Sequence, residues 1–447
     1  MNILLVNPPR SPFNAIRSFA PDAAKPFIHK KLIGPPLGLL TVAAAVAHHN
    51  VSVLDMKAEY DINEHAPDMA DLVVSYCKKT SPKIVGVTVI ASEFDASCEI
   101  LQAVKKYDPK ILTMAGGLHP TLCPKDFAGT NADIICIGQA SHMFAEIVHA
   151  KETGQDLASV PGCMINTKLG LIPTPGKPAF RDYAKQDFLM PNRSLIRQWL
   201  PAYLAPGGSG QKATYLFTSL GCPYKCSFCS IWPQMDGHFY LRNIESIIAE
   251  LRTLTDYGVV RFADANSVID VGFAWNLFDR INQEGLNKFF IMDIRSDTAA
   301  KNPDLISHMA KAGLKVVICG FESFRQNELS SFNKQLDAAT IKKAIAIFHD
   351  NGIMVRGNYV VPPDYDEADF DALAEFANAE KVTYAGYTIL TPMPGTKLFI
   401  AMKDRIIDHD LRKYNFFNCV CKTKLPLDTF HEKVGALWLV KKGSEII

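Results

Sequence analysis

Short apolar runs alternate with helical periods along the first 150 residues, a pattern typical of a parallel sheet covered on both faces. An alanine-rich helix is expected over 38–47 and another over about 95–106. The expected strands are 3–6, 51–54, 84–89, 111–114 and 134–137. Five strands at this spacing predict a doubly wound, Rossmann-like domain over residues 1–150, whose ligand site lies at the carboxyl ends of the strands.

A second alternating series begins at residue 214. Its expected strands are 214–218, 259–262, 289–293, 316–319, 354–360 and 384–390, and its helices are 244–257, 274–284, 303–312, 338–351 and 366–379. A complete eight-unit barrel needs about 250 residues, more than this region offers. The pattern therefore predicts an α/β fold with a partial, six-unit TIM-like barrel over residues 212–400.

Between the two series, residues 151–211 show weaker periodicity. Prolines recur along this stretch, and Gly207-Gly208-Ser209-Gly210 closes it. This composition predicts a linker, with a short hairpin around 163–173. The last part of the chain, residues 401–447, is short and mixed in pattern and is expected to form a C-terminal extension.

Composition agrees with a folded, multidomain protein. The 447 residues are 48% hydrophobic and 21% charged, and the net charge of +1 gives no reason to expect nucleic acid as a partner. The first residues lack the basic leader of a signal peptide, and the longest apolar stretch, 37–47, is too short for a transmembrane helix. We therefore expect a cytoplasmic protein without a transmembrane segment.

Eleven cysteines without an export signal argue against a disulfide framework. Most lie singly in apolar segments, where a small buried side chain is the simplest role. Cys419 and Cys421 would point to one face of a strand, and core packing is favoured there over a redox role on the substrate side.

Cys222, Cys226 and Cys229 form a CxxxCxxC pattern directly after the first strand of the barrel series. Thiolates suit iron–sulfur clusters and zinc. A structural zinc site needs four ligands, and the nearest downstream candidates, His238 and Cys319, have no finger-like spacing. Three thiolates on a four-iron cluster instead leave one iron open to a substrate. Zinc, or three core cysteines, remain the alternatives.

At these residues the chain resembles the radical S-adenosylmethionine superfamily, whose signature is similar to residues 218–229. The resemblance implies a 4Fe–4S cluster on the three cysteines, S-adenosylmethionine on the open iron and a 5′-deoxyadenosyl radical. It also implies an electron donor such as flavodoxin or ferredoxin. Leu220 departs from the pattern, since relatives often carry arginine there, and we expect it to affect local packing.

The resemblance assigns further cofactor-binding residues in the barrel. Glu322 and Ser323 would hydrogen-bond the ribose hydroxyls, and Phe228 would lie at the same cofactor. Arg295 could pair with the carboxylate of S-adenosylmethionine, or form an ordinary salt bridge to Asp293 or Asp297.

Other segments at the strand ends carry weaker signals. Asp264 and Asn266 could form a polar network or contact the substrate directly. Residues 357–362 resemble an adenine-packing element, although Pro362 stands where relatives often have glycine. Residues 391–396 resemble the turn after the sixth strand, and a rigid proline-rich turn explains them equally well.

The first domain resembles that of the cobalamin-binding subgroup, so the resemblance covers nearly the whole chain. It rests on residues 7–9, 35–39 and 116–121. Gly116 and Gly117 would admit the nucleotide tail of the corrin, with His119 packed near it. The DxHxxG motif is missing and residues 8–20 contain no histidine, so no protein imidazole should bind cobalt. Residues 138–141 depart from the subgroup, which leaves a structural or cofactor-free domain as the alternative.

The pairing of the two domains predicts a cobalamin-dependent methyltransferase that acts on an unactivated carbon of a small-molecule or lipid-like substrate. A radical cyclisation, rearrangement or oxygen insertion without methyl transfer is the alternative on the same cofactors. A non-catalytic zinc or iron–sulfur redox module is the alternative of another class. A tRNA-modifying enzyme shares the cluster but is disfavoured by the near-neutral charge. No residue is singled out as the group that handles substrate protons.

Overall fold

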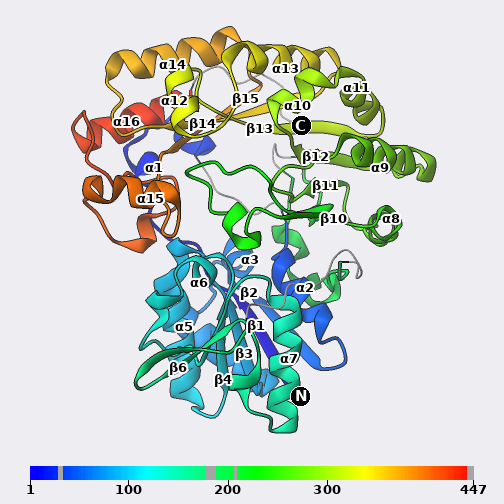
Figure 1. Cartoon of the computed structure of the whole chain (residues 1–447), viewed down its shortest axis with the longest axis vertical. Coiled ribbons are helices and arrows are strands. Elements are labelled where there is room, and N and C mark those ends of the chain that lie inside the picture. The colour runs from blue at the N-terminus through cyan, green and yellow to red at the C-terminus, as the bar shows by residue number, and fades with distance from the viewer. Residues whose placement is uncertain (29–33, 177–187, 206–208, 440–447) are drawn as a thin grey trace. The chain divides into compact units, whose positions relative to one another are not determined.

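The structure, a computed structural model, describes residues 1–28, 34–176, 188–205 and 209–439 (Figure 1). The chain divides into two compact units. Unit 1 comprises residues 1–12, 34–203 and 230–237, and unit 2 comprises residues 13–33, 204–229 and 238–447. Neither unit is a continuous stretch of chain, so the division differs from the sequence-based boundaries at 150 and 212.

Unit 1 is built on a seven-stranded sheet in the order β2-β1-β3-β4-β5-β6-β7. The first five strands are parallel and match the five predicted runs, so the doubly wound fold is confirmed. They are β1 (Asn2–Asn7), β2 (Asn50–Asp55), β3 (Ile84–Thr88), β4 (Leu112–Gly116) and β5 (Ile134–Cys136). The order reverses between β1 and β3, which is where open sheets of this type bind ligands.

In the described part of unit 1, six helices connect the strands. They are α2 (Leu37–Ala45), α3 (Met56–Ile62), α4 (Met69–Thr80), α5 (Phe94–Tyr107), α6 (Leu118–Leu122) and α7 (Ala140–Thr153). Local signals explain their ends. The Asp68 side chain accepts from the Asp71 N–H at the start of α4, and Lys78 and Lys79 lie in its last turn, where cations are favourable.

Part of the predicted linker folds onto unit 1. The predicted hairpin exists as β6 (Cys163–Thr167) and β7 (Gly170–Pro173), and β6 pairs antiparallel with β5. Further on, the 3₁₀ helix η5 (Arg193–Ala202) buries Trp199, whose indole N–H donates to Glu59 at 2.8 Å. Two other parts of the linker, residues 177–187 with Pro178 and residues 206–208, lie outside the described residues.

Unit 2 contains a six-stranded parallel sheet in the order β15-β14-β13-β12-β11-β8. All six strands match the predicted series, and the two edge strands do not pair, so the partial barrel is confirmed. They are β8 (Ala213–Leu216), β11 (Val259–Phe262), β12 (Phe289–Asp293), β13 (Leu314–Glu322), β14 (Met354–Val361) and β15 (Tyr384–Ile389).

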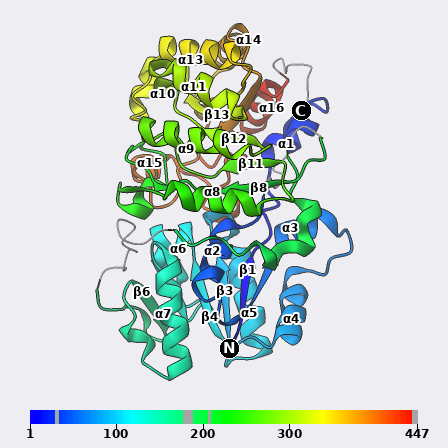
Figure 2. The same cartoon turned by 90° about the vertical axis from the view of Figure 1, so that its right-hand side faces the viewer.

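The helices of the barrel series follow their strands, as βα units require. They are α8 (Ile244–Thr253), α9 (Val271–Glu284), α10 (Ser296–Lys301), α11 (Pro303–Lys311), α12 (Gln326–Ser331), α13 (Ala338–Asp350) and α14 (Glu367–Ala379). Helices α9, α10 and α11 cover the outer side of β11–β13 (Figure 2). There Phe262, Phe278 and Phe290 pack with ring centroids 5.5–6.2 Å apart.

The C-terminal extension folds as part of unit 2. Helices α15 (Lys397–Met402) and α16 (Leu427–Leu437) belong to this unit, and α16 packs against α14 and against α1 (Ala15–Phe19) from the other end of the chain. In the described part of the chain, no helix is long and apolar enough to cross a membrane.

Candidate functional site

Three cysteines lie on one loop of unit 2, residues 222–229, which we call the cysteine loop. It begins where β9 (Ser219–Gly221), paired antiparallel with β10 (Phe239–Leu241), ends. Cys226 is buried, whereas Cys222 and Cys229 are partly exposed, and none of them forms a disulfide. Because iron–sulfur clusters are held by cysteine thiolates, this donor set fits a cluster with three protein ligands.

The turn of residues 331–334 holds the cysteine loop in place. The Ser227 N–H donates to the Phe332 carbonyl at 3.1 Å, and Asn333 Nδ2 donates to the Lys225 carbonyl at 3.0 Å. The ring of Phe228 meets that of Phe332 edge-on, with centroids 5.6 Å apart. Phe228 therefore has a packing role within unit 2, and its assignment to S-adenosylmethionine stays a prediction.

Asp264, after β11, fixes the backbone that leads into the cysteine loop. Its buried carboxylate accepts from the Thr218 N–H (2.8 Å), the Thr218 hydroxyl (2.6 Å) and the Ser219 N–H (2.9 Å). Burial raises the pKa of Asp264 to about 6, and these hydrogen bonds oppose the rise. Asp264 thus forms part of a polar network, one of its two predicted roles.

Several buried polar atoms at the same ends of the barrel strands have no hydrogen-bond partner among the described residues, and Ser219 Oγ and Asn266 Nδ2 are two of them. Leaving a buried polar group unsatisfied costs about 1–3 kcal/mol. Such groups are expected where a polar ligand binds. Ser219 lies three residues before Cys222, and Asn266 follows the Asp264 that bonds to Ser219, a placement that fits a small polar cofactor such as S-adenosylmethionine.

Arg295, after β12, is held on three sides. Its guanidinium lies 3.9 Å from the ring centroid of Tyr224, donates twice to Asp297 (2.9 and 3.2 Å), and donates to the Lys334 carbonyl at 3.1 Å. The predicted salt bridge to Asp297 is therefore present, whereas Asp293 pairs with Arg261. Binding of a cofactor carboxylate by Arg295 stays a prediction.

Glu322 forms a buried ion pair that no local pattern in the sequence indicates. Lys334 Nζ lies 2.8 Å from Glu322 Oε1, and the glutamate adopts a left-handed φ of 62° at a register shift in β13. A Cβ at Gly320 would lie 2.3 Å from that same oxygen, so a larger residue there would displace the Glu322 carboxylate. The ion pair gives Glu322 a role within the protein, and a ribose contact by Glu322 stays a prediction.

The hydroxyl of Ser323 serves the start of α12. It donates to Glu328 Oε2 at 2.5 Å and accepts from the Arg325 N–H at 3.0 Å, and Tyr365 also donates to Glu328 at 3.0 Å. The buried hydroxyl is thus engaged within the protein. Its predicted contact with the ribose is not tested by these bonds.

Positive charge lies beside the cysteine loop. Burial raises the pKa of the Cys222 and Cys226 thiols, and the cations Arg295 and Lys334 oppose this rise. Cations near thiolates lower the cost of their negative charge. Lys334 and Asn333 were not among the predicted site residues, because both lie about 100 residues after the cysteines, in a polar stretch without a motif.

In unit 1, the glycine pair at the end of β4 is explained first by close packing. Gly117 has a φ of 108°, and a Cβ there would lie 3.0 Å from Thr88 Oγ1 and from the Val89 backbone. The Val89 N–H donates to the Gly116 carbonyl at 2.8 Å. Gly116 and Gly117 lie at the carboxyl end of the parallel strands, which fits the predicted place of a corrin tail, and that contact stays a prediction.

His119 lies inside unit 1. Its ring packs against Phe94 and Phe127, with centroids 5.2 and 5.8 Å away, and Nε2 lies 3.1 Å from Asp126 Oδ2. Burial lowers the pKa of His119, and the Asp126 carboxylate opposes the fall. The structure thus shows a core histidine, and its predicted place near the corrin tail is not tested.

A second polar group at the same sheet end was missed. The buried carboxylate of Asp55, at the end of β2, accepts from Asn7 Nδ2 and from the Tyr203 hydroxyl, each at 2.8 Å. Burial raises the pKa of Asp55, and these bonds oppose the rise. Asp55 directly after an apolar run was a usable signal. Tyr203 carried none, since it lies 148 residues further along the chain.

Two family models match the chain. Residues 27–148 match the B12 binding domain, and residues 216–377 match the Radical SAM superfamily. The first match covers most of the parallel sheet of unit 1, and the second covers the cysteine loop and the four barrel strands β11–β14.

Similar proteins extend the match to most of the chain. An uncharacterized methyltransferase from Pyrococcus horikoshii is 27% identical over 95% of this chain and 88% of its own. An anaerobic magnesium-protoporphyrin IX monomethyl ester cyclase from Rubrivivax gelatinosus is 25% identical over 76% of this chain and 62% of its own. The radical S-adenosylmethionine methyltransferase TsrM from Kitasatospora setae, solved with tryptophan substrate, shares the fold with a TM-score of 0.68. It is 18% identical, and the match covers 90% of this chain and 76% of TsrM.

Proposed function

Since the chain belongs to the cobalamin-binding subgroup of the radical S-adenosylmethionine superfamily, we propose that it is a methyltransferase acting on an unactivated carbon. The observation that carries the proposal is the presence, in one chain, of a three-cysteine loop at the ends of barrel strands and a B12 binding domain. The methyltransferase names of relatives that span most of the chain support it.

When bound, the cluster with S-adenosylmethionine supplies a 5′-deoxyadenosyl radical, and cobalamin supplies a methyl group. The residues of this chain bind and orient these groups. Cys222, Cys226 and Cys229 would hold the cluster, while Asp264 keeps the backbone before them in place. The unpartnered Asn266 Nδ2 would donate to a polar group of S-adenosylmethionine. Burial at these strand ends would keep water from a reactive radical.

The same proposal includes a small-molecule or lipid-like substrate. The tryptophan bound to TsrM and the tetrapyrrole named for the cyclase support small molecules as the class.

An electron must reach the cluster, and we expect flavodoxin or ferredoxin to supply it. The proposed compartment is the cytoplasm, where reducing conditions keep cysteine thiols free.

The proposal can be tested without the natural substrate. The full-length chain, expressed with cobalamin, purified without oxygen and reconstituted with iron and sulfide, would be incubated with S-adenosylmethionine and dithionite. We expect 5′-deoxyadenosine and S-adenosylhomocysteine, because the radical and the methyl group come from separate S-adenosylmethionine molecules. Both products are measured by mass spectrometry.

Cysteine variants provide the control. Cys226→Ser should lose the cluster and at least about 100-fold of 5′-deoxyadenosine formation, since a ligand is removed. Cys98→Ser removes a partly exposed thiol of α5 in unit 1 and should change neither. A reconstituted wild-type chain that forms no 5′-deoxyadenosine would contradict the radical proposal.

The cyclase relative supports a second candidate, a radical cyclisation, rearrangement or oxygen insertion without methyl transfer. It predicts 5′-deoxyadenosine without S-adenosylhomocysteine. Once a substrate is found, product mass separates the two candidates, since methyl transfer adds one methylene unit.

A further inference from the structure

A group of metal-ligating side chains lies in unit 1, apart from the cysteine loop. His119, Cys123 and Asp126 each offer a ligand atom, and these atoms all lie within 4.8 Å of one another. His119 belongs to α6, and Asp126 to the 3₁₀ helix η3 (Pro124–Phe127) that continues it, with Cys123 at the junction. The three residues are four and three positions apart, and the non-helical junction at Cys123 (φ −132°, ψ 55°) separates the two short helices.

The histidine is fixed in an orientation that suits a ligand. Its ring is buried between Phe94 and Phe127, so it has little freedom to turn. Nε2 lies 3.1 Å from Asp126 Oδ2, yet among the described residues it has no aligned hydrogen bond. Two ligands of a tetrahedral zinc ion, each bound at about 2.0–2.2 Å, lie at a similar spacing from each other.

Access and charge also suit a cation. The exposure of the three residues increases from the buried His119 through Cys123 to the exposed Asp126, which provides a path from solvent. Within the described ranges, no lysine or arginine lies within ion-pair distance of Asp126. The carboxylate therefore has no compensating side-chain cation of its own.

We propose that His119, Cys123 and Asp126 bind one zinc ion, with water in the fourth position. Imidazole, thiolate and carboxylate together are ligands that zinc accepts, and three protein ligands with one open position form a known type of zinc site. Zinc replaces the proton of the Cys123 thiol, and that proton passes to solvent. The ion would join α6 to η3 directly after the Gly116-Gly117 turn. In this proposal the His119 ring binds the metal and does not contact the corrin.

The experiment uses the full-length chain with its cluster reconstituted, so that Cys222, Cys226 and Cys229 are occupied. One equivalent of zinc chloride is added, loosely bound metal is removed on a chelating resin, and zinc and iron per chain are counted by mass spectrometry. We expect about one zinc in the wild type and less than about one-tenth in Cys123→Ser and Asp126→Asn, with iron unchanged.

Cys98→Ser is the matched control, because Cys98 is also a partly exposed thiol of unit 1, and it should keep its zinc. X-ray absorption at the zinc edge should show one sulfur at about 2.3 Å with nitrogen and oxygen ligands. Thermal melting without zinc checks that both ligand variants fold. A folded wild type that retains no zinc, equal zinc in Cys123→Ser, or three sulfur ligands at the edge would overturn the proposal.

Discussion

Two buried carboxylates in unit 2, Asp264 and Glu322, are satisfied in different ways. Asp264 accepts from two backbone N–H groups and a hydroxyl, whereas Glu322 pairs with the ammonium of Lys334. The first arrangement orders the backbone before the cysteine loop, and the second holds a glutamate in an unfavourable left-handed conformation. Both depend on single atoms, so single substitutions should test them.

Asp264→Ala should leave three buried donors without an acceptor. At about 1–3 kcal/mol for an unsatisfied buried group, we expect a loss of about 3 kcal/mol in the free energy of unfolding, and less than half of the wild-type iron after reconstitution. Urea denaturation and iron analysis measure both. Asp264→Asn keeps one acceptor oxygen for the two N–H groups and should retain most of the iron. Equal iron and stability in the alanine variant would contradict this role.

Lys334→Met should leave the buried Glu322 carboxylate without its positively charged partner. Removing one partner of a buried ion pair costs about 3–5 kcal/mol, so urea denaturation should show a loss of that size. Adding Glu322→Gln should recover at least about half of it, because the uncompensated charge is gone. Lys342→Met is the matched control, since the more exposed pair of Lys342 with Glu380 should be worth less than about 1 kcal/mol. A double variant no better than Lys334→Met would rule out the ion pair as the cause.

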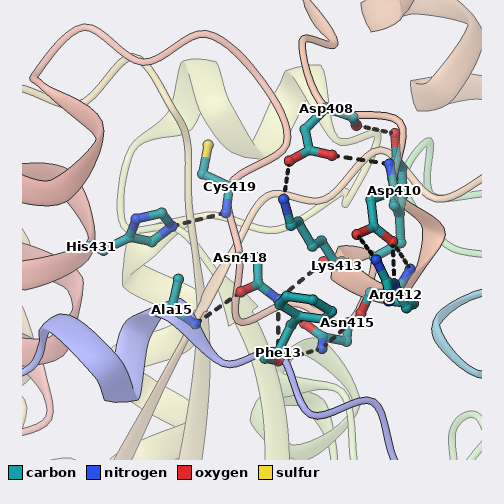
Figure 3. Close-up of polar contacts among 11 residues, drawn as sticks. Phe13, Ala15, Asp408, Asp410, Arg412, Lys413, Asn415, Asn418, Cys419 and His431 are labelled. Atoms are coloured by element: carbon teal, nitrogen blue, oxygen red, sulfur yellow. Dashed lines mark hydrogen bonds and ion pairs between the residues drawn. The ribbon is translucent and has the colours of Figure 1, made fainter.

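At the element scale, the segment before α16 shows how distant pieces of chain complete unit 2. Asn415 Nδ2 donates to the Phe13 carbonyl at 2.8 Å, and the Ala15 N–H donates to Asn418 Oδ1 at 2.9 Å (Figure 3). The same close-up shows His431 of α16, whose Nε2 accepts from the Cys419 N–H at 3.0 Å. Hydrogen bonds across about 400 residues thus tie α1 to the C-terminal extension.

His431 should make the stability of unit 2 fall in mild acid. Burial lowers the pKa of His431 to about 4, against about 6.5 in the unfolded chain, while Asp428 opposes the fall. The unfolded state therefore takes up the proton first as the pH drops. The contribution of neutral His431 to the free energy of unfolding is fully present above about pH 6.5. It decreases by about 1.4 kcal/mol per pH unit as the pH falls towards 4.

The measurement is urea denaturation at about pH 7 and pH 5 for the wild type and His431→Gln. Glutamine offers an acceptor for the Cys419 N–H but does not titrate, so the variant should lose less stability between the two pH values than the wild type does. The same slope in both proteins would show that another group governs the acid response.

At the scale of the whole molecule, each compact unit includes a segment whose sequence neighbours belong to the other unit. Residues 13–33 belong to unit 2, although they follow the first strand of unit 1, and residues 230–237 belong to unit 1, although they follow Cys229 directly. Within unit 1, the 3₁₀ helix η6 (Trp232–Met235) packs against α6. The two cofactor sites nevertheless draw their assigned residues from different units.

We therefore expect that loss of the cluster at the cysteine loop leaves corrin binding in unit 1 unchanged. A Cys222→Ser, Cys226→Ser, Cys229→Ser triple variant expressed with cobalamin should lose its iron but retain corrin at the wild-type ratio, measured from the visible spectrum and from cobalt analysis. Added hydroxocobalamin should still raise its melting temperature, because a ligand that binds the folded state stabilises it. A folded triple variant without corrin would show that the sites depend on each other.

The strands and the cysteine loop could be predicted because their signals are local. Runs such as 84–89 and 259–262 are apolar, short and bounded by turn residues, and β3 and β11 lie there. Helix α4 was not predicted, since its buried residues, Leu72, Val73 and Cys77, are few among polar neighbours. Lys334 and Tyr203 could not be assigned, because their partners lie elsewhere in the chain.

The sequence by itself determined the two sheets, their order along the chain and the three thiols on one loop, because alternation and close spacing act within a few residues. Only the tertiary structure decided which side chains surround those thiols and which segment joins which unit. Asp264 bonds to the backbone before the cysteine loop, Asn333 bonds to the Lys225 carbonyl within it, and Lys334 adds positive charge near Cys226. Phe13 reaches Asn415 across the chain. Burial then selects such pairs, because a polar group removed from water must find its partner within the fold.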